Sequence, residues 1–405
     1  METFAALSAV GAERVTANEL RKLGLPVLET GFARIRFSAD IAGCYRALMG
    51  LRTADRVLWE AARFPAGDFD ALFEGARNAA WESFIPRDWG LRVAKVRVAR
   101  SKLQSVTSIQ AVVHKAAAER LCRKYRLARL PDDAGAATAE VRVYLDRDEA
   151  ALYLDLSGEP LFRRGYRTEG GAAPLRETTA AALLFLAAWR RKHPLCDPFC
   201  GSGTIAIEAA MYAWDMAPGL GRDFTLSALL PADPAVERAV REDFLGRVNF
   251  ERTIRIYGSD TDVRAISQAK SNLVRAWELA RGKRAHTGGR GIRTGAELPA
   301  GAARAALPDF RVAGMAEARA EGTAEDGETG FIITNPPYGI RLGGEEEAAA
   351  LYGSMARLAR NFPGWKLGVI TNQPGFESYF GTKADSCREI TNGPVETYFF
   401  QYERL

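Results

Sequence analysis

The residues best able to carry chemistry lie at 335–338, where an apolar run ends in Asn-Pro-Pro-Tyr. Residues 331–334 are apolar or β-branched and predict a strand, which the two prolines end because proline has no N–H for a sheet. The amide oxygen of Asn335 and the carbonyl of Pro336 are two acceptors for an amino group, and Tyr338 offers a flat face for a base. The motif can therefore hold an exocyclic amino group through both of its hydrogens, and such hydrogen bonds would strengthen if the amine attacked a methyl group.

A second motif, Asp-Pro-Phe-Cys-Gly-Ser-Gly-Thr at 197–204, predicts a ligand-binding turn between a strand and a helix. No Gly-Lys-Ser/Thr follows, so the turn is not a phosphate-binding P-loop. A nicotinamide dinucleotide site stays open, since Ala206 nearly completes that glycine pattern. However, the acid expected about 20 residues later is missing, and Asp197 would repel a pyrophosphate. An acid at this position suits a ligand with a cationic amino acid end.

Asp260 ends the next predicted strand, so its carboxylate is expected beside the glycine turn. There it can accept hydrogen bonds from both hydroxyls of a ribose. The alternative is that Asp260 caps the following helix, although Thr261 or Asp262 could do so instead.

The pattern around these motifs predicts the fold. From about residue 175, strands and helices alternate, which indicates a mostly parallel sheet covered on both faces. Residues 1–65 and 66–155 mix strands with helices and predict small α+β modules. Residues 281–329 show little periodicity and predict an elaborated loop.

The composition is that of an ordinary globular protein, with 405 residues, 47% hydrophobic and 26% charged. No apolar run approaches the roughly 20 residues that span a membrane, and the first residues lack the basic start of a signal peptide. Five scattered cysteines and three histidines do not form a zinc-binding pattern, so no metal is predicted. We expect a cytoplasmic protein.

Residues 91–129 contain eleven Lys and Arg and a single acid, Glu119. Such a block can bind a phosphate backbone through counterion release, and the alternative is a solvated helix face. We expect nucleic acid to bind here, through Arg97, Lys102, Lys115, Arg120, Arg123 and Lys124.

The motifs also carry a family resemblance. DPFCGSGT, the strand end GSD and NPPYG resemble motifs of class I S-adenosylmethionine-dependent methyltransferases. Three further stretches are similar to THUMP-domain-containing guanine-N2 RNA methyltransferases, the group that includes the bacterial RlmL-type 23S rRNA enzymes. These stretches are LDLSGEPLFRRGYR (154–167), APLRETTAAALL (173–184) and MAPGLGRDF (216–224).

The resemblance implies an α/β fold: a Rossmann-like, seven-stranded methyltransferase domain preceded by ferredoxin-like and THUMP α+β domains. The expected boundaries are 1–65 for the ferredoxin-like domain, 66–160 for THUMP, 161–180 for a linker and 181–405 for the methyltransferase domain.

The resemblance also implies roles for single residues. Related enzymes usually place an Asp near the adenine amino group, where this chain has Gly314 and Met315, with Glu317 just beyond, so that contact stays open. The implied S-adenosylmethionine-binding residues are Asp197, Phe199, Gly201, Gly203, Asp260, Thr178 and Met315, and Asn335, Pro336 and Tyr338 would hold the target guanine.

The leading interpretation is methylation of guanine N2 in RNA, most readily 23S rRNA. A tRNA guanine-N2 methyltransferase is the alternative, since THUMP-type domains also serve tRNA enzymes. A DNA amino-methyltransferase shares NPPY but not the long N-terminal region. A non-catalytic RNA-binding assembly factor would not need the complete motifs.

Overall fold

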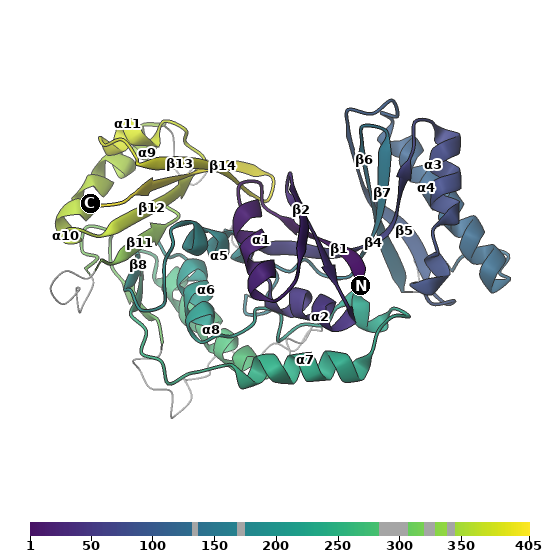
Figure 1. Cartoon of the computed structure of the whole chain (residues 1–405). Coiled ribbons are helices and arrows are strands. Elements are labelled where there is room, and N and C mark those ends of the chain that lie inside the picture. The colour runs from purple at the N-terminus through teal and green to yellow at the C-terminus, as the bar shows by residue number, and fades with distance from the viewer. Residues whose placement is uncertain (132–136, 168–174, 283–306, 320–328, 338–344) are drawn as a thin grey trace.

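The computed structural model describes residues 1–131, 137–167, 175–282, 307–319, 329–337 and 345–405. Two seven-stranded sheets organise these residues, one in the N-terminal and one in the C-terminal part of the chain (Figure 1). Within the described residues, no helix is long and apolar enough to cross a membrane.

The N-terminal sheet begins with the strand–helix–strand–strand–helix–strand order of a ferredoxin-like domain, as the resemblance implied. The spatial order β2-β3-β1-β4 follows from antiparallel pairing of β1 with both β3 and β4. Asp40 caps α2 by accepting a hydrogen bond from the Gly43 N–H. The elements are β1 (Glu2–Ser8), α1 (Glu13–Lys22), β2 (Val27–Gly31), β3 (Arg34–Ala39), α2 (Ile41–Gly50) and β4 (Ala54–Pro65).

The predicted second module belongs to the same sheet as the ferredoxin-like domain, because β4 pairs with strands of both. The first part of β4 pairs with β1, and residues 58–65 pair with β7. The sheet then runs on through β6 to β5, and helices α3 and α4 pack together beside it (Figure 1). The elements are α3 (Phe69–Asn78), the 3-10 helix η1 (Trp81–Ser83), β5 (Gly90–Ala99), α4 (Val106–Tyr125), β6 (Thr138–Asp146) and β7 (Glu149–Asp155).

The C-terminal sheet has the order β10-β9-β8-β11-β12-β14-β13. Its first five strands are parallel, and β14 is antiparallel to both neighbours, which confirms the predicted Rossmann-like methyltransferase sheet. The strands are β8 (Leu195–Asp197), β9 (Ile256–Asp260), β10 (Asp309–Val312), β11 (Phe331–Thr334), β12 (Lys366–Thr371), β13 (Ser386–Asn392) and β14 (Val395–Tyr402).

Helices cover both faces of this sheet. Ile333 of β11 packs in the core that includes α6 and α8, whereas its neighbour Ile332 packs in a separate core under the last helices. This alternation is expected because successive strand side chains point to opposite faces. The helices are α5 (Glu177–Leu186), α6 (Thr204–Ala213), α7 (Pro234–Gly246), α8 (Val263–Ala280), α9 (Glu345–Ser354), α10 (Leu358–Asn361) and α11 (Phe376–Phe380), with η2 (Thr225–Ala228) and η5 (Met355–Arg357) as 3-10 turns.

Two sequence-based expectations need correction. Strand β10 lies within residues 281–329, which the pattern predicted as loop; residues 283–306 and 320–328 lie outside the described residues. The single helix expected after residue 345 is divided, because η5 separates α9 from α10. Helix α7, capped by Asp233, was not predicted.

Candidate functional site

The glycine turn between β8 and α6 has the backbone that the motif predicted. Gly201 and Gly203 both have positive φ, +51° and +83°. A Cβ added to Gly203 would lie 2.9 Å from the Phe310 ring and 3.0 Å from Ala269, so glycine is needed there for space as well as conformation. Gly203 occupies the N-cap of α6 and supplies no side-chain cap, which leaves the first N–H groups of the helix facing the turn.

Asp260 lies against this turn and does not cap α8. Its Oδ2 accepts a hydrogen bond from the Gly201 N–H at 2.9 Å, and its Oδ1 accepts one from the Asp262 N–H at 3.0 Å. Asp262 is the N-cap residue, accepting from the Arg264 N–H. Each Asp260 oxygen keeps a free lone pair, so the carboxylate can still accept two ribose hydroxyls.

Asp197 is a buried carboxylate without a cationic partner among the described residues. Its Oδ1 accepts hydrogen bonds from the Thr334 hydroxyl at 2.6 Å and the Phe199 N–H at 3.2 Å. Burial raises the pKa of Asp197 to about 7, and the nearby charge of Asp260 adds to the rise. A ligand ammonium group placed here would stabilise the charged form, which fits the predicted contact with an amino acid end.

Asn335 follows β11 with its amide oxygen buried and without a hydrogen-bond partner among the residues that the structure describes. A buried acceptor left unpaired is costly, so a ligand donor at this position would be strongly favoured. Pro336 is buried beside it, and the Pro337 carbonyl accepts a weak hydrogen bond from Tyr352 at 3.4 Å. Tyr338 lies outside the described residues.

A second asparagine in the same situation, Asn372, was not predicted from the sequence. It follows β12, the parallel neighbour of β11, and its amide oxygen is also buried without a partner in the described part of the chain. Because β11 and β12 are parallel neighbours, Asn335 and Asn372 both follow the carboxyl ends of adjacent strands, at the same edge of the sheet. The signal was present, since Thr-Asn-Gln-Pro at 371–374 repeats the pattern of Thr-Asn-Pro-Pro at 334–337.

A hydrogen-bond chain joins the two loops that carry these asparagines. The Tyr352 hydroxyl of α9 lies 2.9 Å from the Thr371 hydroxyl and 3.4 Å from the Pro337 carbonyl. Tyr352 is fully buried, so its hydrogen bonds hold the segment after β11 and the end of β12 in a fixed relative position.

Thr178 and Met315, the two remaining predicted cofactor-binding residues, take no part in the hydrogen bonds of the glycine turn described above. Thr178 donates to Asp55 at 2.6 Å, and Arg176 pairs with the same carboxylate at 2.8 Å, so this end of α5 is joined to the ferredoxin-like domain. Met315 is buried in the apolar cluster against which Phe199 packs, and Glu317 is exposed. Contact of Thr178, Met315 or Phe199 with a cofactor stays a prediction.

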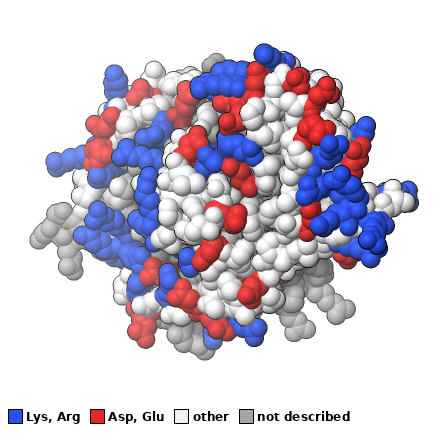
Figure 2. All heavy atoms as spheres, turned by 45° about the vertical axis from the view of Figure 1, so that its right-hand side comes forward, with Lys and Arg blue, Asp and Glu red and all other residues white. Residues whose placement is uncertain are grey.

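The six predicted RNA-binding residues divide into paired and unpaired cations. Arg120 binds Glu82 through two nitrogens, at 2.9 and 2.6 Å, and Lys115 lies 3.9 Å from Glu119. Figure 2, turned so that this module comes forward, shows Lys and Arg gathered in groups on the surface with acids between them. The exposed residues that form no ion pair with a described residue are Arg97, Lys102, Arg123 and Lys124.

Two family models match the chain. The model described as "RMKL-like, methyltransferase domain" matches residues 164–280 and 301–399. The model described as "RlmL ferredoxin-like domain" matches residues 3–58. The predicted boundaries at 65, 160 and 180, and the THUMP assignment of the second module, stay predictions.

Curated proteins match along nearly the whole chain. "Putative RNA methyltransferase YpsC" of Bacillus subtilis (strain 168) is 33% identical over 400 residues, which cover 99% of this chain and 95% of that protein. "Ribosomal RNA large subunit methyltransferase K/L" of Syntrophotalea carbinolica is 32% identical over 410 residues, covering 99% of this chain and 53% of that protein. The chain therefore spans about half the length of the K/L relatives it matches.

Solved structures agree with these matches. "A possible methylase from Clostridium difficile 630" superposes with a TM-score of 0.84 at 33% identity, covering 100% of this chain and 98% of that one. A second methyltransferase, solved in complex with S-adenosylhomocysteine, gives a TM-score of 0.81 at 30% identity, with the same coverage. S-adenosylhomocysteine is what remains of S-adenosylmethionine after methyl transfer.

Proposed function

Because the chain belongs to the S-adenosylmethionine-dependent RMKL-like methyltransferase family, we propose that it methylates the exocyclic N2 amino group of a guanine in 23S rRNA. The observation that carries this proposal is the amide oxygen of Asn335 at the carboxyl end of β11, which is buried and has no hydrogen-bond partner in the described part of the chain. The names of the K/L relatives support ribosomal RNA as the substrate class.

The cofactor would lie across the carboxyl ends of β8 and β9. Asp197 would pair with its ammonium group, the glycine turn would pass its methionine end, and Asp260 would accept its ribose hydroxyls. The three contacts match a ligand that is cationic at one end and carries a nucleoside at the other. S-adenosylmethionine supplies an electrophilic methyl group on a sulfonium centre.

The target amine would be held by Asn335 and the carbonyl of Pro336, with Tyr338 against the base. As the amine nitrogen attacks the methyl carbon it becomes positively charged, so its N–H bonds to these acceptors strengthen in the transition state. The amine would lose its extra proton to solvent after the methyl group has been transferred, so the site needs no strong base beforehand.

Asn372 supports guanine over adenine as the base. On its Watson–Crick edge, guanine presents an N1–H donor next to the N2 amino group, whereas adenine presents a bare N1 acceptor beside its amino group. The amide oxygens of Asn335 and Asn372, which follow adjacent strands, would together complement two adjacent donors. An adenine would leave the second oxygen unpaired.

We therefore expect Asn372→Ala to lower kcat/KM for RNA by about tenfold to a hundredfold, because the base loses a buried hydrogen-bond acceptor. Steady-state methylation of RNA measures the change, and Asn372→Asp, which keeps an oxygen acceptor, should retain more activity. The neighbouring change Gln373→Ala serves as the control. Unaltered kcat/KM in Asn372→Ala would exclude the contact.

Arg97, Lys102, Arg123 and Lys124, which pair with no acid among the residues that the structure describes, would bind the RNA backbone. Reversing Arg123 and Lys124 to Glu is expected to weaken RNA binding and to reduce the slope of log affinity against log salt by about one for each phosphate that the protein no longer neutralises. Filter binding between low and moderate salt measures the slope. Arg357→Glu with Arg360→Glu makes the same charge change on the methyltransferase domain. Equal slopes in both double variants would argue against RNA binding at Arg123 and Lys124.

The substrate class is tested by transfer of labelled methyl groups to separated rRNA and tRNA that lack native modification. Label in rRNA alone is the expected result. Label in tRNA alone would replace this proposal by the tRNA alternative. If neither RNA is labelled while cofactor is bound, naked RNA is not the substrate and the proposal fails as stated.

A further inference from the structure

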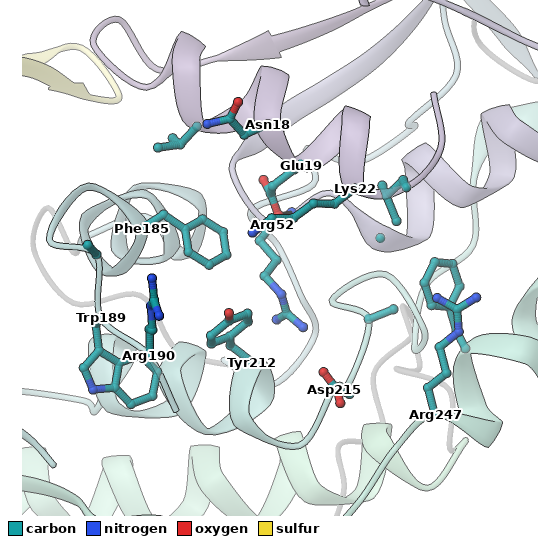
Figure 3. A pocket seen from close by; sticks show the side chains of 16 residues that line it. Asn18, Glu19, Lys22, Arg52, Phe185, Trp189, Arg190, Tyr212, Asp215 and Arg247 are labelled. Carbon is teal, nitrogen blue, oxygen red and sulfur yellow. Dashed lines mark hydrogen bonds between the residues drawn. The ribbon is translucent and has the colours of Figure 1, made fainter. Parts of the chain in front are cut away.

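A cavity of about 580 Å³ lies between the ferredoxin-like domain and the methyltransferase domain (Figure 3). Helix α6 begins at the glycine turn, and Tyr212 near its other end lines the cavity. At 1.5 Å per residue, Tyr212 is about 12 Å along the helix from Thr204. The cavity is therefore separate from the proposed methylation site, and its volume falls in the range of roughly 300–1,000 Å³ of small-molecule sites.

One wall of this cavity is aromatic. The rings of Phe185 and Tyr212 meet edge to face with centroids 5.2 Å apart, and Trp189 lies 6.1 Å from Tyr212. Trp189 is buried, whereas Phe185 and Tyr212 are half-buried and present ring surface to the cavity. A planar ring of a ligand could stack there.

Arg52 supplies a buried cation beside that wall. Its Nη2 donates to the Met216 carbonyl at 2.5 Å, and its guanidinium carbon lies 5.4 Å from the centre of the Tyr212 ring. Only 8% of Arg52 is exposed, and its Nη1 has no hydrogen-bond partner among the described residues. A buried guanidinium nitrogen without an acceptor favours binding of an anion.

The charged residues that line the cavity are four cations, Lys22, Arg52, Arg190 and Arg247, and two acids, Glu19 and Asp215, so the lining is positive on balance. Lys22 from α1 and Arg190, just beyond α5, both line the cavity, and no described residue forms an ion pair with either. Both acids are already engaged. Glu19 accepts hydrogen bonds from the backbone of residues 52 and 53, and Asp215 pairs with two arginines outside the cavity lining, Arg191 and Arg252.

We propose that this cavity binds a nucleoside monophosphate unit, with its base against Phe185 and Tyr212 and its phosphate held by Arg52, Lys22 and Arg190. An aromatic wall beside a group of cations recognises a planar ring that lies next to an anion. The unit is either a free nucleotide or one residue of a bound RNA, since both present the same chemistry.

The first arm of the test is titration calorimetry of the full chain, saturated with S-adenosylhomocysteine, with guanosine and adenosine 5′-monophosphates. Inorganic phosphate and the nucleosides are titrated as partial ligands. If the cavity binds free nucleotides, binding should be saturable and tighter for the nucleotide than for phosphate or the nucleoside alone. Nucleotide affinity should fall by about tenfold or more in the Lys22→Glu, Arg190→Glu double variant. Arg21→Glu with Arg238→Glu makes the same charge change on α1 and α7 outside the cavity and should bind normally.

The second arm tests RNA as the source, by hydrogen exchange of the protein with and without RNA. An RNA-borne unit predicts protection of residues 185–190 and of the end of α6 in the wild type and the control, but not in the Lys22→Glu, Arg190→Glu variant. The proposal is overturned if nucleotides bind both double variants equally. It is also overturned if neither nucleotides nor RNA engage the cavity, whether or not the protein methylates guanine.

Discussion

Asn335→Ala is expected to lower the rate of methyl transfer by about two to three orders of magnitude while cofactor affinity stays unchanged. The amide oxygen is buried without a partner among the described residues, and its proposed hydrogen bond to the amine strengthens as charge develops. Losing one such acceptor should resemble losing a single oxyanion-hole donor. Single-turnover methylation measures the rate, and titration with S-adenosylhomocysteine measures the affinity.

Asn335→Asp is the matched control, because it keeps an oxygen at the same position and should retain more of the rate than alanine. Thermal unfolding with and without S-adenosylhomocysteine excludes misfolding as the cause. A rate for Asn335→Ala within a few-fold of the wild type would remove Asn335 from the mechanism.

The second large effect concerns pH and the cofactor. The pKa of Asp197 is raised to about 7 by burial, and only the ionised carboxylate can pair with an ammonium group. Affinity for S-adenosylhomocysteine is therefore expected to fall by about tenfold per pH unit below 7, or about a hundredfold between pH 7 and pH 5, and to level off above pH 7.

The raised pKa of Asp197 also makes the stability of the folded protein depend on pH. Since the folded pKa of Asp197 lies above the usual value of 3.8, the contribution of this group to stability is complete at low pH and is lost as pH rises from about 4 to 7. Cofactor binding should reverse that loss, because the ammonium group stabilises the ionised form.

The Asp197→Asn variant distinguishes titration of Asp197 from titration of other groups with a similar pKa. One such group is Glu177, whose pKa is also raised to about 7 by burial. The variant should bind S-adenosylhomocysteine weakly, with little dependence on pH. Calorimetric titrations at half-unit steps from pH 5 to 8 make the comparison. A wild-type affinity that is constant across this range would exclude ion pairing between Asp197 and the cofactor.

Local pattern was sufficient to predict the elements that carry the site. The glycines at 201 and 203 need positive φ, and the prolines at 336 and 337 end a strand, so each motif determines its own backbone. The parallel sheet followed because strands and helices alternate along the chain. The expectation that a neighbour of Asp260 caps the following helix is confirmed, because Asp262 is the N-cap residue of α8.

Pairing between strands that are far apart in the chain could not be predicted from local sequence patterns. That β4 joins both N-terminal modules in one sheet depends on β7, which lies about 90 residues later in the chain, and strand propensity carries no such information. Asn372 was missed although Thr-Asn-Gln-Pro at 371–374 repeats the pattern of 334–337, because only the pairing of β12 with β11 shows that the two asparagines follow adjacent strands. The hydrogen bond from Thr178 to Asp55 likewise appears only when the two domains pack together.

The most direct test of the central claim is the identity of the methylated nucleoside. RNA labelled by the protein with S-adenosylmethionine would be digested completely, and the nucleosides would be separated and identified by mass against standards. The account predicts N2-methylguanosine as the labelled product, lost in Asn335→Ala. A product methylated on adenine or cytosine, or on another atom of guanine, would contradict it.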